Sequence, residues 1–151
     1  MSERTFKLTV VSPDRSLAHD LQVLAVGAKG TEGDFTALPG HLPFLTDLKP
    51  GLMWYRGADH REQEVFVSGG FVEVLPEAVT VLADSAELPG EIDAERAERA
   101  RIRRLNRLKA LKAKVAGGEI DTTEGEIEIK KVEIKLNRSM ARLKAVKTQR
   151  K

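Results

Sequence analysis

The first 85 residues alternate between apolar and polar side chains with a period of two. Phe6, Leu8 and Val10 alternate with Lys7 and Thr9, the pattern of a strand that is buried on one face. Similar short apolar stretches follow, each ended by glycine, proline or aspartate, at residues 21–25, 52–56, 65–67, 71–75 and 79–82. This regular spacing of strands and turns is typical of an antiparallel sandwich or barrel.

The hydrophobic pattern becomes helical after Leu88-Pro89-Gly90. Apolar residues then recur every three or four positions, which predicts amphipathic helices. In the first helix these residues are Ile102, Leu105, Leu108, Leu111 and Val115. In the second they are Ile129, Val132, Leu136, Met140, Leu143 and Val146. Gly117-Gly118 is expected to end the first helix, and Thr123 with Glu126 has the spacing of a capping box that begins the second.

These patterns predict an α+β protein with two parts. An N-terminal antiparallel β-sandwich is expected over residues 1–88, followed by a C-terminal two-helix antiparallel hairpin over residues 89–151. The helices are expected to be about 24 and 27 residues long. Such a hairpin buries only one stripe on each helix and is marginally stable alone, so we expect it to dock reversibly on the sandwich or on a partner.

Charge and aromatic residues divide at the same place. Residues 1–90 contain 7 basic and 13 acidic side chains, a net charge of −6, whereas residues 91–151 contain 18 and 10, a net of +8. The last aromatic residue is Phe71, and the chain has no cysteine. The C-terminal part therefore lacks large side chains for a dense core, and disulfides and thiolate chemistry are excluded. The absence of a long apolar run predicts a soluble, intracellular protein.

No constellation of catalytic or metal-binding residues is found. Ser68, His41 and Asp84 are the residue types of a hydrolase triad, but Val67-Ser68-Gly69 is not the G-x-S-x-G motif of such enzymes. The three histidines are scattered singly, so no metal site is predicted. We therefore expect no catalytic residues, although a small hydrolase remains an alternative.

A glycine repeat and a basic tail raise two further alternatives. Gly27, Gly30 and Gly33 match neither a dinucleotide-binding fingerprint nor a phosphate-binding loop, and are expected to form a surface loop. The basic tail is compatible with a nucleic-acid-binding or scaffold protein. It lacks aromatic side chains for base stacking, and interleaved acids dilute its charge, so we expect no nucleic-acid partner.

Ordered motifs in the first part resemble the epsilon subunit of bacterial F-type ATP synthases. They are residues 8–13 (LTVVSP), 38–51 (LPGHLPFLTDLKPG), 67–76 (VSGGFVEVLP) and 79–84 (VTVLAD). The resemblance implies a non-catalytic rotor subunit of the central stalk, with catalysis in the hexamer of alpha and beta subunits. It implies contacts of the sandwich with the gamma subunit and the ring of c subunits, for which Asp34, His41 and Leu42 are the matching residues.

The resemblance also implies a regulatory nucleotide site. Residues 92–97 (IDAERA) match the motif that begins the first helix in bacterial members, and some of these bind ATP there. The implied site comprises Glu87, Ile92, Asp93, Arg96, Ala97, Arg103, Arg138 and Arg142. The implied subunit performs no bond chemistry and therefore requires no cofactor. ATP is expected only as a regulatory ligand.

The family further implies a regulatory change of shape. A compact hairpin leaves the motor free, whereas an extended one reaches the alpha/beta hexamer and inhibits ATP hydrolysis. The expected location is peripheral, on the cytoplasmic face of the bacterial inner membrane, with attachment through the complex.

Overall fold

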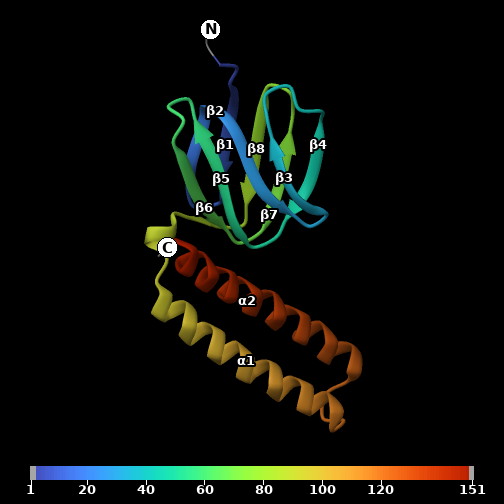
Figure 1. The fold of residues 1–151 in the computed structure, drawn as a ribbon. Helices are drawn as coiled ribbons and strands as arrows, with labels where there is room; N and C mark the ends of the chain where they lie inside the picture. The colour runs from blue at the N-terminus through green and yellow to red at the C-terminus, as the bar shows by residue number, and fades with distance from the viewer. Residues whose placement is uncertain (1–2, 150–151) are drawn as a thin grey trace. The chain divides into compact units, whose positions relative to one another are not determined.

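The computed structural model describes residues 3–149, and its first unit, Met1–Glu91, is a β-sandwich (Figure 1). The strands within the described residues are β1 (Phe6–Val11), β2 (Ser16–Gly30), β3 (Gly33–Ala37), β4 (Phe44–Leu48), β5 (Gly51–Gly57), β6 (Glu62–Val67), β7 (Gly70–Val74), β8 (Ala78–Ala83) and β9 (Ala86–Glu87). A short 3-10 helix, η1 (Pro89–Glu91), follows. The predicted sandwich is confirmed.

Strand β2 connects the two layers of the sandwich. Between Ser16 and Val23 it pairs with β1, and between Val23 and Gly30 it pairs with β5 and β3. The hydrogen-bonded order is β1-β8-β7-β4-β2-β5-β6-β9, with β3 added beside β2. These pairings are antiparallel except that of β1 with β8, which is parallel.

The core lies between the layers and follows the period-two pattern. Phe6, Leu8 and Val10 of β1 are buried, as the alternation predicted. Strands β7 and β8, in the same layer as β1, contribute Val72, Val74, Val79 and Val81, and strands β5 and β6 contribute Met53, Val65 and Val67. β-branched valine suits these positions because its restricted side chain packs well on a pleated surface.

The glycine repeat is not a surface loop, contrary to the prediction. Gly27 and Gly30 lie within β2, and Gly33 begins β3. Gly30 is opposite Gly33, so Thr31 and Glu32 form a two-residue hairpin turn. Gly33 has a φ of +135°, which a side chain would strain. The strand predicted around residue 23 therefore continues to Gly30 instead of ending at Gly27.

The second unit, Ile92–Lys151, contains the predicted pair of helices, which lie side by side and antiparallel in Figure 1. Helix α1 is Ala94–Ala116 and helix α2 is Thr122–Gln149. After α1, the N–H of Gly118 donates to Val115 O and that of Glu119 to Lys114 O, and Gly118 has a φ of +76°. The predicted glycine termination is thus confirmed.

Helix α2 begins differently from the prediction. The carboxylate of Asp121 accepts hydrogen bonds from the N–H groups of Thr123 and Glu124, at 3.1 and 3.4 Å. Asp121 therefore caps the helix, and the proposed Thr123–Glu126 capping box was wrong. An aspartate is as good a cap as a threonine and lies one residue before the helix, so it takes precedence.

In the part of the hairpin that the structure describes, the buried residues are few and, apart from two leucines, small. They are Ala97, Ala100, Leu108, Leu111, Gly125, Ser139 and Ala145. Two apolar residues of the predicted stripes, Ile102 and Met140, are instead about half exposed, at 47% and 51%. The hairpin thus buries little apolar surface, which agrees with its composition.

Candidate functional site

An exposed apolar face covers strands β4, β7 and β8. Leu45, Phe71 and Leu82 are 68%, 54% and 54% exposed. Phe71 is opposite Leu82 in the β7–β8 ladder, whereas Leu45 is opposite Glu73 in the β4–β7 ladder. Three large apolar side chains are therefore gathered on one face of the sandwich, where a partner can cover them.

The loop before β4 contains two of the predicted contact residues. Leu42 is 80% exposed, and Nδ1 of His41 lies 2.6 Å from its carbonyl oxygen. The N–H of Gly40 donates to Pro76 O, which ties this loop to the β7–β8 turn. The His41 ring is 6.3 Å from that of Phe44. The loop is thus held in place while Leu42 projects into solvent.

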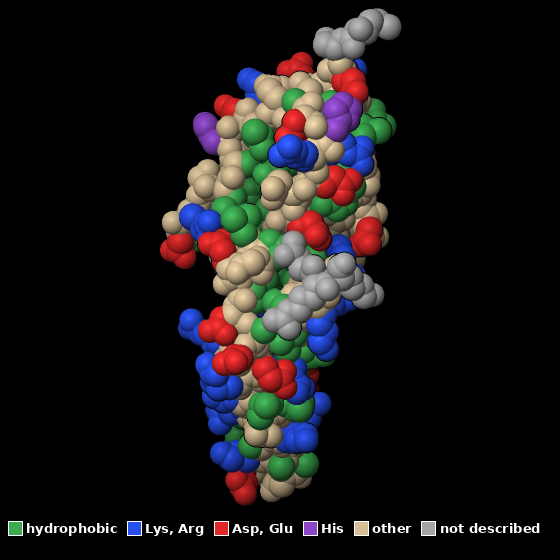
Figure 2. Space-filling model, turned by 60° about the vertical axis from the view of Figure 1, so that its left-hand side comes forward, with side chains coloured by type: hydrophobic (Ala, Val, Ile, Leu, Met, Phe, Trp, Pro, Cys, Tyr) green, Lys and Arg blue, Asp and Glu red, His purple; other side chains and the backbone are tan. Residues whose placement is uncertain are grey.

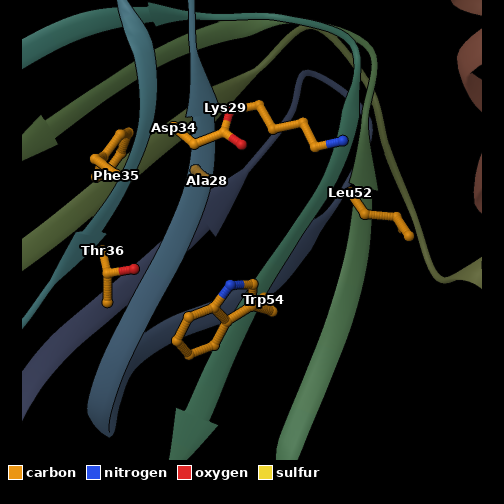
Figure 3. A pocket seen from close by; sticks show the side chains of 7 residues that line it. All are labelled: Ala28, Lys29, Asp34, Phe35, Thr36, Leu52 and Trp54. Carbon is orange, nitrogen blue, oxygen red and sulfur yellow. The ribbon is translucent and has the colours of Figure 1, made fainter.

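Asp34, the third predicted contact, lies at the other end of β3 and is exposed. It is opposite Lys29 of β2 and lines a pocket of about 330 Å³ that also includes Thr36, Leu52 and Trp54 (Figure 3). Phe35 and Phe44 connect this region to the loop of His41, since their rings are 5.3 Å apart.

At the start of the hairpin, the predicted nucleotide residues have structural roles. Asp93 is the N-cap of α1 and accepts a hydrogen bond from the Arg96 N–H at 3.0 Å. Ala97 is buried and the Arg96 side chain is exposed. Ile92 is half-buried just before the cap. Glu87 belongs to β9 in the sandwich unit.

The remaining predicted residues, Arg103, Arg138 and Arg142, lie near enough to Arg104 for their charges to act on it. Arg104 lies between the helices, donating to Lys135 O at 3.0 Å and to the hydroxyl of Ser139. Its pKa is lowered from the ordinary value by partial burial, and then by the positive charges of neighbouring arginines. These neighbours are Arg103, Arg142 and Arg138.

Sequence reasoning missed Arg104 itself. A signal was available, because Arg104 is four residues before buried Leu108 and so falls on the buried side of α1. It was assigned no individual role from the sequence. Arg104 is hard to single out because many Lys and Arg side chains gather over the helices, as Figure 2 shows for the face in view.

The residues of the hydrolase alternative do not present a nucleophile. Ser68 is only 3% exposed, and its hydroxyl accepts a hydrogen bond from Ser85 Oγ at 2.7 Å. His41 Nδ1 is directed to a backbone oxygen instead. In the part of the chain that the structure describes, no three His, Asp or Glu side chains are grouped as metal ligands.

Comparisons with known proteins decide the family. The domain family described as ATP synthase, Delta/Epsilon chain, beta-sandwich domain matches residues 5–89. The ATP synthase epsilon chain of Desulforapulum autotrophicum is 39% identical over 149 residues, or 99% of this chain and 100% of the relative. The chain belongs to the ATP synthase epsilon-chain family. The epsilon chain of Nitratidesulfovibrio vulgaris strain DP4 is 47% identical over 95 residues, 63% of this chain and 69% of that relative.

Solved structures share the fold of this epsilon chain. A chain in the mitochondrial ATP synthase structure of Euglena gracilis (OSCP/F1/c-ring) has a TM-score of 0.67 at 23% identity. The alignment covers 91% of this chain and 78% of that one. A chain in the central stalk/c-ring structure of Tetrahymena thermophila mitochondrial ATP synthase has a TM-score of 0.50 at 16% identity. That alignment covers 60% of this chain and 72% of the other.

The protein is therefore an epsilon subunit of an ATP synthase. An epsilon chain is a non-catalytic subunit, which confirms that the protein is not itself an enzyme. The family assignment also sets aside a free-standing nucleic-acid-binding function. Over residues 3–149, no helix has the length and apolar character needed to cross a membrane.

Proposed function

We propose that this epsilon chain transmits rotation from the c-subunit ring to the gamma subunit, and that its hairpin regulates ATP hydrolysis. The observation that carries the first part is the exposed apolar face of Leu45, Phe71 and Leu82. Burying about half of each such side chain against gamma provides a hydrophobic attachment that is strong enough to follow a turning shaft.

The c-ring contact is assigned to Asp34, His41 and Leu42. The carboxylate of Asp34 is exposed and suits polar or basic loops. Leu42 supplies an apolar tip on a loop that is hydrogen-bonded to its neighbours. A rigid loop loses little conformational entropy on docking, and this favours it as a contact in a rotor.

The regulatory part is supported by the weak packing of the hairpin. Its buried residues are mostly small, whereas Ile102, Ile127, Ile134 and Met140 are each about half exposed. An element that buries so little can leave one docking position for another at low cost. In the extended state its basic helices contact the alpha/beta hexamer in a salt-sensitive manner and block hydrolysis.

ATP is the proposed regulatory ligand of the hairpin. The closeness of Arg103, Arg138 and Arg142 to Arg104 supports a site for its phosphates, since guanidinium groups pair well with phosphate oxygens. Preferential binding to the compact state would favour an uninhibited enzyme. The subunit acts at the cytoplasmic face of the bacterial inner membrane, where it is held peripherally by the complex.

Two measurements test this function. Full-length chain should retain both gamma and the c-ring when it is isolated from detergent-solubilised enzyme, and failure to retain either would remove the rotor role. Deletion of residues 92–151 should leave the sandwich in the complex but raise the ATP hydrolysis rate of membranes several-fold. An unchanged rate, with unchanged sensitivity to membrane potential, would show that the hairpin is not a brake.

A further inference from the structure

The two helices enclose a cationic groove beyond the proposed nucleotide residues. It has a volume of about 410 Å³ and is lined by Arg103, Arg104, Arg107, Glu128, Lys131, Val132 and Lys135. Five of these seven side chains are cationic and one is acidic. Only Arg103 is shared with the nucleotide site considered above. We propose that this groove binds a polyphosphate anion through its phosphates alone.

The positive charge of the groove is poorly balanced by protein groups. Glu128 is its one lining carboxylate, and it pairs with Lys131 at 3.4 Å. Arg104 is partly buried, and both of its acceptors, Lys135 O and Ser139 Oγ, are neutral. Partial burial and the neighbouring arginines lower the pKa of Arg104. An anion in the groove would relieve this repulsion between like charges.

The spacing of the cations favours a chain of phosphates over a single one. Arg103 and Arg107 lie one turn apart on α1, and Lys131 with Lys135 repeats this spacing on α2. One helical turn is about 5.4 Å along the axis, so the cations on each helix can contact more than one phosphate group of a chain. Three guanidinium groups suit the paired oxygens of phosphate.

The dimensions and lining define the ligand class further. A volume of about 410 Å³ is that of a small-molecule pocket, whereas an acidic protein surface needs a broader contact. Val132 is the one apolar residue that lines the groove, and the hairpin has no aromatic side chain. The site therefore has no platform for a nucleobase, and binding should depend on phosphate number and not on the base.

Calorimetry on the full chain tests the proposal, with tripolyphosphate, ATP, GTP and orthophosphate as probes. At the groove the three triphosphates should bind with similar affinity and orthophosphate at least tenfold more weakly, whereas a further binding event seen with ATP alone would belong to the nucleotide site. The paired change Lys131→Gln and Lys135→Gln should weaken tripolyphosphate binding about tenfold or more. The matched control is Lys109→Gln with Lys112→Gln, which removes two exposed charges of α1 outside the groove and should change binding less than threefold. Glutamine keeps helix propensity, so circular dichroism should remain unchanged.

Several results would contradict the proposal that the groove binds polyphosphate. One is equal loss of affinity in the test and control pairs, which would indicate general charge attraction. Another is binding of a poly-glutamate peptide as tight as that of tripolyphosphate, which would indicate an acidic protein partner. Loss of tripolyphosphate binding in Asp93→Asn would assign the signal to the nucleotide site instead. Conversely, ATP regulation can fail while tripolyphosphate still binds, so the two proposals stand or fall separately.

Discussion

The indole ring of Trp54 lies directly over Gly27 across the β2–β5 ladder. A Cβ atom at Gly27 would be 2.1 Å from Trp54 Nε1, which is far inside contact distance. The guanidinium of Arg56 lies 5.8 Å from the same ring. The glycine is therefore required by the tryptophan opposite it, and not by a turn.

Replacing Gly27 with alanine should displace this indole. Because displaced packing typically costs 1–3 kcal/mol, we expect Gly27→Ala to lower the free energy of unfolding by about 2 kcal/mol. Trp54 is the single tryptophan, so its emission should shift to longer wavelength as the ring becomes more exposed. Gly90→Ala is the control, since no atom lies within 4 Å of its added Cβ. If Trp54→Ala does not reduce the cost of Gly27→Ala in a double-mutant cycle, the contact is not its cause.

The carboxylate of Glu91 should titrate below its ordinary pKa of 4.5. A hydrogen bond from the Leu88 N–H at 2.8 Å lowers this pKa most, followed by Arg15, whose Nη1 lies 3.1 Å from both oxygens. The bonds therefore stabilise the fold fully above pH 4.5, and this stability is lost as the pH falls through the lowered folded pKa. Carbon NMR titration should show the low midpoint, and Arg15→Gln should raise it only in part. A midpoint of 4.5 or above in wild type would contradict this arrangement.

Phe71 should contribute to gamma binding without contributing much to folding. Because its side chain is 54% exposed, Phe71→Ser should leave the unfolding temperature nearly unchanged. The same change should weaken the association with gamma about tenfold or more. Phe71→Leu keeps most of the apolar area and should restore most of the affinity in a pull-down or calorimetric titration. Full affinity in the serine variant would place the gamma contact on another face.

Two substitutions at Asp93 should separate capping from ligand binding. Asparagine keeps a side-chain acceptor for the Arg96 N–H, whereas alanine removes it and should cost the helix about 1 kcal/mol. Both remove the carboxylate. If the carboxylate orients bound ATP, both variants should bind ATP more weakly by calorimetry, but only alanine should lower the helix stability. If Asp93→Asn binds ATP with wild-type affinity, Asp93 serves only as the helix cap and does not orient the nucleotide.

The sequence predicted the elements better than the side-chain environments. Period-two alternation located Phe6, Leu8 and Val10 correctly, because burial on one face of a strand determines that pattern directly. The role of Gly27 depends on Trp54, which is 27 positions away, so no local pattern could indicate it. Nothing near residue 33 signalled a strand either, because glycine disfavours strands unless tertiary contacts require it.

The candidate sites were predicted only in part, because several charged residues were identified and their neighbours Arg104 and Ser139 were not. The family resemblance brought Arg103, Arg138 and Arg142 into one hypothesis, and the positive charges of all three act on Arg104 in the structure. Arg104 was missed because a long basic side chain at a buried helical position resembles the solvated arginines around it. The buried Ser139, which accepts its hydrogen bond, was also missed, because a polar residue that interrupts the apolar stripe of α2 gives no sign of being buried.

The continuity of β2 has a mechanical consequence. One unbroken strand of 15 residues is hydrogen-bonded to β1 at one end and to β3 and β5 at the other. A load applied at the hairpin turn beside Asp34 therefore reaches the opposite layer along covalent bonds. The two layers cannot slide past one another without breaking ladder hydrogen bonds on both sides, so the head of the subunit should twist as a single stiff body under torque.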